Sequence, residues 1–190
     1  REIFSKCYVD WIFHLAGKAS IVPSIKNPES YHKVNVTGTL NVLQLARILN
    51  AKKFIYAASG SCYGIPNEVP TSENCRINPM YPYALTKYLA EQYVVYWSNI
   101  YSLPFISLRL FNVFGPRMCL SGGYGGLFST ILAQKFNNQP VIIIGDGEQR
   151  RDFVYVADVA RAFLAAAESS ATNEIFNIGR GYPVSVNYIL

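Results

Sequence analysis

Residues 11–16 read Trp-Ile-Phe-His-Leu-Ala, a short apolar run with neither the alternation of a half-exposed strand nor the period of a helix. Such runs are typical of strands buried in a parallel sheet. Apolar residues then follow at largely helical spacing over residues 28–50, and residues 53–58 form a second apolar run. We expect a further helix at residues 81–101 and a further strand at residues 105–110. This alternation predicts a doubly wound α/β fold with a parallel, Rossmann-like sheet covered by helices on both faces.

The second part of the chain is less regular, although it contains no repeat and no low-complexity segment. In chain order, we expect a Gly-rich loop at residues 121–126, an amphipathic helix ending near residue 137, a strand at 141–144, an Ala-rich helix at 157–169 and a strand at 174–178. The composition is even along the chain, so we find no linker between two independent units.

Composition and charge exclude several classes of protein. The 190 residues are 51% hydrophobic and 15% charged, which is sufficient for a substantial core. The net charge of +5 is not gathered into a basic stripe, so nucleic-acid binding is not expected. No apolar run is long enough to span a bilayer, and no signal peptide is recognisable, so we expect a cytoplasmic protein. The cysteines are scattered without a C-x-x-C pair, which argues against a metal site or a disulfide framework: Cys7, Cys62, Cys75 and Cys119.

A candidate proton-transfer pair lies in the third expected helix. Tyr83 and Lys87 are four residues apart, which places a phenol and an ammonium on one helix face. Chance alone gives roughly 0.6 such pairs in a chain of this composition, so the spacing needs support from its context. A phenol acts as a base near neutrality only if its pKa falls from about 10 to about 7, which costs about 4 kcal/mol. We expect the Lys87 ammonium to supply that amount from a distance of about 4 Å.

Ser59 and several sequence motifs surround Tyr83 and Lys87 along the chain. Ser59 follows the strand at residues 53–58, where catalytic groups of parallel sheets gather. Further motifs follow in a fixed order, namely His-Leu-Ala-Gly at 14–17, Asn-Val-Thr-Gly-Thr at 35–39, Arg-Leu-Phe-Asn-Val-Phe-Gly-Pro-Arg at 109–117, and the segment 145–159 that begins Gly-Asp-Gly. With these motifs the chain resembles the NAD-dependent epimerase/dehydratase family of extended short-chain dehydrogenases/reductases, and among its members the nucleotide-sugar (UDP-glucose) 4-epimerases.

The resemblance implies a cofactor, a substrate and a set of site residues. Residues 1–115 would be part of an NAD-binding domain, and residues 116–190 part of a nucleotide-sugar-binding region that returns to the main sheet. The implied catalytic residues are Ser59, Ser61, Tyr83 and Lys87. NAD would contact Leu15, Ala16, Gly17, Asn35, Ala57, Ala58, Tyr83, Lys87, Phe111 and Val113. A nucleotide-diphosphate sugar, most commonly a UDP-hexose, would contact Lys18, Ser59, Ser61, Asn112, Gly126, Leu127, Val141 and Arg151. Relatives of this kind also imply a homodimer packed through residues 35–50 and 81–101.

Some of these residues have alternative roles. His14 lies on an apolar strand and is expected to be structural rather than catalytic. Arg151 suits phosphate oxygens, but it could also simply pair with Asp152 or Glu148. The Gly-rich loop could support the nucleotide or be an ordinary surface loop.

By resemblance, the reaction is an oxidation of the sugar at C4 followed by reduction on the opposite face. Dehydratases of the family add an Asp-Glu pair for elimination, and sugar decarboxylases keep the Glu. Here these positions hold Gly60 and Ser61, and neither can transfer that proton. The resemblance therefore favours a 4-epimerase over a 4-ketosugar reductase or a dehydratase.

One motif of the family is not found in these 190 residues. The Gly-x-x-Gly-x-x-Gly turn that binds the pyrophosphate is absent, as is the acidic residue that binds the adenosine ribose. We expect the first strands of the sheet and the end of the substrate region to lie outside this chain, and the choice between NAD and NADP stays open. A truncated chain that binds no cofactor is the alternative of another class.

Overall fold

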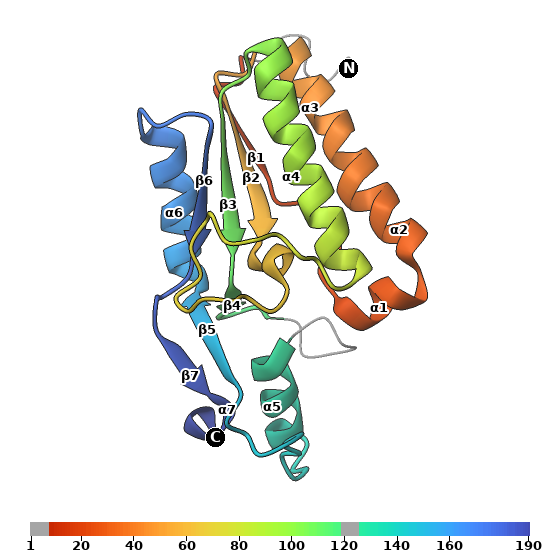
Figure 1. Ribbon diagram of the computed structural model, residues 1–190, viewed down its shortest axis with the longest axis vertical. Helices are drawn as coiled ribbons and strands as arrows, with labels where there is room; N and C mark the ends of the chain where they lie inside the picture. Colours follow the sequence, from red (N-terminus) through yellow and green to blue (C-terminus); the bar gives the residue numbers. More distant parts are fainter. Residues whose placement is uncertain (1–7, 119–125) are drawn as a thin grey trace.

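The computed structural model describes residues 8–118 and 126–190 (Figure 1). Its main sheet has the strand order β1-β2-β3-β6, and every neighbouring pair is parallel. The strands are β1 (Trp11–His14), β2 (Lys53–Ser59), β3 (Phe105–Leu110) and β6 (Glu174–Ile178). The predicted parallel α/β fold is therefore confirmed.

Helices cover both faces of this sheet, as the alternation of elements predicts. One face is covered by α1 (Ile21–Lys26), α2 (Pro28–His32), the π-helical turn η2 (Lys33–Thr37), α3 (Gly38–Ile48) and α4 (Pro82–Tyr101). The opposite face is covered by α6 (Val156–Glu168). The helix expected at residues 28–50 is thus interrupted by a π turn, a feature that often accompanies functional sites.

Strand β2 is the centre of the core, because all seven of its residues are buried. Alternate side chains point to opposite faces of a strand, so β2 serves two packing layers. Phe54 packs with Leu43 and Val94 of the helices α3 and α4. Ile55 packs with Phe163 of α6 on the other side. Burial on both faces explains why this segment has an uninterrupted apolar sequence.

A second, smaller sheet lies beyond the carboxyl end of the main sheet (Figure 1). Its order is β4 (Asn112–Phe114), β5 (Arg150–Tyr155) and β7 (Pro183–Ser185), with β5 parallel to β4 and antiparallel to β7. The helices α5 (Gly126–Phe136) and α7 (Val186–Ile189) accompany it, and a short 3₁₀ turn, η3 (Gly60–Tyr63), follows β2. Strand β6 then returns to the main sheet beside β3.

The strand expected at residues 141–144 is wrong. These residues form an irregular segment, and Ile142 and Ile144 are 70% and 86% exposed. A strand requires a hydrogen-bonding partner, and within the described residues this segment pairs with no strand of either sheet. High β propensity without a pairing partner does not produce a strand.

We searched the described residues for membrane-spanning helices and for clusters of metal-binding side chains. In residues 8–118 and 126–190, no helix is long and apolar enough to cross a membrane. Within the same ranges, no three His, Cys, Asp or Glu side chains gather as a metal site would require. Cys62 and Cys75 are free thiols, and burial raises the pKa of Cys62 to about 12.

Candidate active site

A cavity of about 510 Å³ lies where the carboxyl ends of β2 and β3 face the second sheet. Such an edge is the usual ligand site of an open parallel sheet. Most residues predicted for the site line this cavity: Leu15, Gly17, Lys18, Ala57, Ala58, Ser59, Tyr83, Lys87, Phe111, Asn112, Val113, Gly126, Leu127 and Arg151. The structure therefore brings together residues that are up to 136 positions apart in the sequence.

Ser59, Ser61 and Tyr83 form a chain of hydroxyl groups at one wall. Ser59 is the last residue of β2, and its side chain caps η3 by accepting a hydrogen bond from the backbone N–H of Ser61 at 3.3 Å. Tyr83 lies in the first turn of α4, which Pro82 begins. The Tyr83 hydroxyl donates to Ser59 Oγ at 3.2 Å, and Ser59 Oγ lies 2.8 Å from Ser61 Oγ. Ser61 is thus connected to the cavity by its hydrogen bond with Ser59 and does not line the cavity itself.

Lys87 lies one helical turn after Tyr83 and is only 7% exposed. Its Nζ lies 4.5 Å from the centre of the Tyr56 ring, in cation–π contact. Burial lowers the pKa of Lys87 to about 8, and the charge of Glu91 opposes this decrease. Near neutral pH the ammonium is therefore still charged, but only by a small margin.

The expected lowering of the Tyr83 pKa by Lys87 is wrong for the protein chain by itself. Burial raises the pKa of Tyr83, and the hydrogen bond from its hydroxyl to Ser59 opposes this increase only in part. The Lys87 ammonium is itself desolvated by burial and lies over the Tyr56 ring. A further positive charge is required before Tyr83 can work as a base near neutrality.

Asn35 lies behind the cavity rather than at its surface. Its side-chain Oδ1 accepts from the backbone N–H of Lys18 at 2.8 Å, and its Nδ2 donates to the Lys18 carbonyl and to Thr86 Oγ1, both at 3.0 Å. A Cβ at Gly17 would lie 3.2 Å from Asn35 Oδ1, so a small residue is favoured there. The π turn η2 thus ties residues 17–18 to helix α4.

His14 has the structural role expected of it. It is buried, its Nε2 lies 2.9 Å from Thr39 Oγ1, and its ring stacks on Tyr56. Burial, together with the charge of Lys87, lowers the pKa of His14 to about 4, so the ring is neutral near pH 7.

The opposite wall is formed by the second sheet. Asn112 Nδ2 donates to the Asp152 carbonyl at 2.8 Å, which holds the start of β4 against β5. The Asp152 carboxylate accepts from the backbone N–H groups of Arg180 and Gly181, both at 2.7 Å. Among the residues that the structure describes, Arg151 forms no ion pair with Asp152 or Glu148; its Nη1 donates to the Arg150 carbonyl at 2.8 Å, and the residue lines the cavity.

Some predicted residues do not line the cavity, and some lining residues were not predicted. Ala16, Asn35, Ser61 and Val141 are absent from the lining, and Val141 belongs to the irregular segment described above. The unpredicted residues are Ala19, Leu110, Met118, Phe128, Gln149, Phe153 and Val186. Phe128 stacks on Phe114 and meets Phe153 edge to face, a contact that depends on the packing of α5 on the second sheet. Residues 121–125 of the Gly-rich loop lie outside the described residues.

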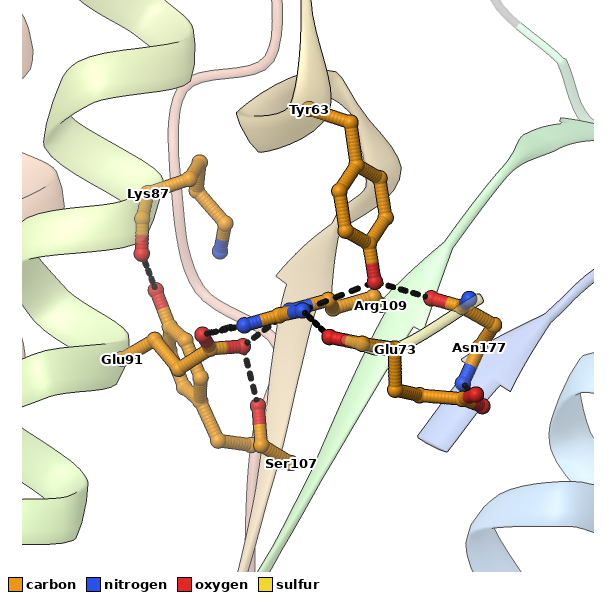
Figure 2. A network of polar contacts seen from close by, with 8 residues as sticks. Tyr63, Glu73, Lys87, Glu91, Ser107, Arg109 and Asn177 are labelled. Atoms are coloured by element: carbon orange, nitrogen blue, oxygen red, sulfur yellow. Dashed lines mark hydrogen bonds and ion pairs between the residues drawn. The ribbon is translucent and has the colours of Figure 1, made fainter. Parts of the chain in front are cut away.

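A buried ion pair joins Arg109 of β3, in the main sheet, to Glu91 of α4 (Figure 2). Both Nη2 and Nε of Arg109 donate to the Glu91 carboxylate, with Nη2–Oε1 at 2.7 Å. Arg109 Nη1 donates to the Tyr63 hydroxyl at 2.7 Å, and this hydroxyl donates to Asn177 Oδ1 at 2.7 Å. The network therefore joins α4, β3 and β6 to the turn η3 that carries Ser61.

A stability prediction follows from the burial of Lys87. The unfolded chain binds a proton at Lys87 more readily than the folded chain does, because the folded pKa is about 8 and the ordinary value is 10.5. The burial of the charged Lys87 side chain therefore lowers the free energy of unfolding. This loss of stability is fully present below pH 8 and disappears as the pH rises through the ordinary lysine range. At pH 7 we expect Lys87→Met to raise the free energy of unfolding by about 1 to 3 kcal/mol, since the lost Tyr56 contact offsets part of the gain.

Urea unfolding at pH 7 and near pH 10.5 measures this difference. We expect the gain to shrink at the higher pH. Lys26→Met is the control, because Lys26 is exposed on α1 and its loss should change the stability by no more than about 0.5 kcal/mol. A Lys87→Met protein less stable than the parent at pH 7 would contradict the prediction.

Comparison with known proteins agrees with this geometry. A model of the NAD dependent epimerase/dehydratase family matches residues 1–179. The chain is 37% identical over 177 residues to a UDP-glucose 4-epimerase of Mycolicibacterium smegmatis, covering 92% of this chain and 56% of that protein. It superimposes with a TM-score of 0.93 on the crystal structure of the Thermotoga maritima UDP-glucose 4-epimerase with UDP-glucose, at 38% identity, covering 99% of this chain and 61% of that one.

A second solved structure contains the cofactor. The Thermus thermophilus UDP-glucose 4-epimerase in complex with NAD gives a TM-score of 0.87 at 31% identity, covering all of this chain and 62% of that one. This chain thus spans less than two thirds of the length of the relatives it matches. The parallel sheet and its carboxyl-edge cavity define a Rossmann-like α/β protein. More particularly, the chain belongs to the NAD-dependent epimerase/dehydratase family.

Proposed function

We propose that the intact protein is an NAD-dependent 4-epimerase of a UDP-hexose. The observation that carries this proposal is the cavity of about 510 Å³, which has two different walls. The hydroxyl groups of Tyr83 and Ser59 lie on one wall, and Asn112 and Arg151 lie on the other. One wall suits proton transfer at a sugar hydroxyl, and the other suits a diphosphate. The relatives described as UDP-glucose 4-epimerases support the same reading.

The residues of the proton-transfer wall also suit a nicotinamide cofactor. Gly17, Ala57 and Ala58 present little side chain at the sheet edge, which leaves room for a flat ring and its ribose. Lys87 would bind the ribose, and Phe111 would border the ring. When bound, NAD supplies the hydride acceptor and, in its oxidised form, a positive charge. That charge is what the raised pKa of Tyr83 requires.

The protein residues then act on one oxygen of the sugar. Ser59 would hold the C4 hydroxyl by a hydrogen bond, and Tyr83 would take its proton during the oxidation for which bound NAD would supply the hydride acceptor. Ser61 steadies Ser59 through their contact of 2.8 Å. Once the 4-keto sugar had turned in the cavity, Tyr83 would return the proton to the same oxygen in the reduction on the opposite face, for which the reduced cofactor would supply the hydride. The net result is inversion at C4.

The turn after β2 supports epimerisation over dehydration. A Cβ at Gly60 would lie only 3.1 Å from the Phe111 ring. An acidic side chain at this position would therefore press on the residue that is proposed to border the nicotinamide. Ser61, at the other dehydratase position, is engaged with Ser59 and lacks a carboxyl group.

Arg151 provides a test of the diphosphate wall. We expect Arg151→Ala to raise KM for UDP-glucose about 10-fold or more while kcat changes little, since a charge-assisted hydrogen bond contributes about 1.5 to 3 kcal/mol. Steady-state kinetics on the intact protein measure this. Arg161→Ala is the matched control, because Arg161 lies on the exposed side of α6 and pairs with Asp158. Equal KM values for both variants would contradict the assignment.

The decisive test of the function is a direct assay. The intact protein is mixed with NAD and UDP-glucose, and we expect UDP-galactose to appear, or the 4-epimer of another UDP-hexose. If neither UDP-glucose nor other UDP-hexoses are converted, the proposal fails. For the truncated-chain alternative, the readout is the melting temperature: an increase on addition of NAD supports binding, and its absence favours a chain without cofactor.

We also propose a homodimer that packs through α3 and α4. Apolar side chains are exposed on these helices, including Ile48 at 52%, Tyr96 at 59% and Ile100 at 50%. Packing against a second copy would bury them. Sedimentation of the intact protein as a monomer at micromolar concentration would contradict this part of the proposal.

A further inference from the structure

Glu91 is a buried carboxylate that the proposed reaction does not use. It lies on α4 four residues after Lys87, and it is 1% exposed. Both of its oxygens are engaged, since Arg109 donates to each of them and Ser107 Oγ donates to Oε2 at 2.8 Å. Figure 2 shows the carboxylate between the Arg109 fork and the helix turn that carries Lys87.

Helix geometry connects Glu91 with the site. Tyr83, Lys87 and Glu91 follow one another at intervals of four residues, so they lie along one face of α4. This face is buried against β2 and β3. The order along the face is therefore a phenol in the cavity, an ammonium at its edge and a carboxylate beneath it.

We infer that Glu91, held in place by Arg109, is a positioning residue that keeps the buried Lys87 ammonium protonated. This inference rests on the proposed function, in which charged Lys87 binds the cofactor ribose. A buried ammonium loses the stabilisation that water gives to its charge, and a fixed negative charge nearby restores part of that stabilisation. The Arg109 fork fixes the orientation of the carboxylate, because two parallel hydrogen bonds define one geometry.

The charges around Lys87 agree with this role. Burial lowers the pKa of Lys87, and Glu91 is the group whose charge raises it. From β2, the neutral Tyr56 offers its ring, and from β1 the His14 ring is neutral because burial and Lys87 lower its pKa. The titratable groups linked to Lys87 are thus Glu91 on α4, Tyr56 on β2 and His14 on β1, and Arg109 on β3 pairs with Glu91. Within this set, Glu91 carries the negative charge.

The titration of Lys87 tests the inference without using enzyme activity. The midpoint is measured on the intact protein by NMR of the Lys87 side chain, with the signal assigned by its loss in Lys87→Arg. In Glu91→Gln we expect the midpoint to fall by about 1 pH unit, because a nearby charge has been removed from a buried group. In activity assays, the loss of kcat at high pH should move downward by the same amount.

A second variant separates charge from folding. Glu91→Gln leaves Arg109 buried without its partner and could unfold the protein, whereas Glu91→Gln combined with Arg109→Met removes both charges and tends to preserve packing. We expect the double variant to have a lowered Lys87 midpoint as well. Ser107→Ala and Tyr63→Phe disturb the same network but retain the carboxylate, so we expect the parental midpoint in both.

The outcomes are exclusive. If the Lys87 midpoint is unchanged in the double variant, or if it falls equally in Ser107→Ala and Tyr63→Phe, the network has only a structural role and the inference is overturned. If the parent protein converts no UDP-hexose, the proposed function fails, but the comparison of midpoints still decides whether Glu91 controls the charge of Lys87.

Discussion

The Tyr83→Phe protein is expected to have a kcat lower by a factor of about 10² to 10⁴, with little change in the affinity for NAD or for the nucleotide sugar. The variant removes one oxygen atom, and with it the hydroxyl that we propose takes the C4 proton. The ring remains, so the wall of the cavity and the packing of the first turn of α4 are preserved.

Coupled assays of UDP-hexose interconversion measure this loss, and calorimetric titration with the nucleotide sugar measures binding. Tyr93→Phe is the matched control, since Tyr93 lies on the same helix and is 38% exposed. We expect it to retain the parental kcat. A Tyr83→Phe variant that keeps more than about a tenth of the parental kcat would show that another group transfers the proton.

Replacing Glu91 with glutamine is expected to lower the free energy of unfolding by about 3 to 5 kcal/mol, because it leaves the Arg109 charge buried without its partner. The side chains of the pair are only 2% and 5% exposed. The guanidinium cannot escape this cost by losing its proton, because arginine stays protonated in proteins.

The chain contains its own control for this prediction. Lys52 and Asp10 form an ion pair with the same N–O distance of 2.7 Å, but their side chains are 75% and 61% exposed. Asp10→Asn should therefore lower the stability by no more than about 1 kcal/mol. Urea unfolding compares the two variants directly, and similar losses in both would show that burial does not set the cost.

The parallel sheet was predictable because its strands are buried on both faces. Strand β2 contains no polar residue between Phe54 and Ala58 except the Tyr56 hydroxyl, so its sequence differs clearly from that of a helix or a half-exposed strand. The segment at 141–144 has a similar sequence but a different structure. An apolar run becomes a strand only if it can pair with a neighbouring strand, and the local sequence does not show whether such a partner exists.

The site was predictable only where its residues belong to motifs. Ser59, Tyr83 and Asn112 were found in this way, whereas Phe128 and Phe153 reach the cavity through the packing of α5 on the second sheet. Glu91 was missed although a signal for it exists. A carboxylate four residues after Lys87 on a buried helix face must have a buried partner, and the charged residue within the apolar strand at 105–110, Arg109, is the candidate.

The pKa of Tyr83 shows the limit of pairwise reasoning. Spacing alone predicts that Lys87 activates the phenol, but burial acts on both groups at once and raises the pKa of Tyr83 while it lowers that of Lys87. Burial and orientation are properties of the folded chain, so the sequence indicated the participants but not the balance of their charges.

The two walls of the cavity have unequal freedom to change during evolution. Ser59 is the end of a strand that is packed on both faces, and Lys87 rests on the Tyr56 ring, so most substitutions around them would disturb the core. The opposite wall belongs to a small, more exposed sheet and to α5. Mutations there can reshape the substrate pocket at little cost in stability. With the proposed function, a protein built in this way can acquire a new sugar substrate while its proton-transfer residues stay the same.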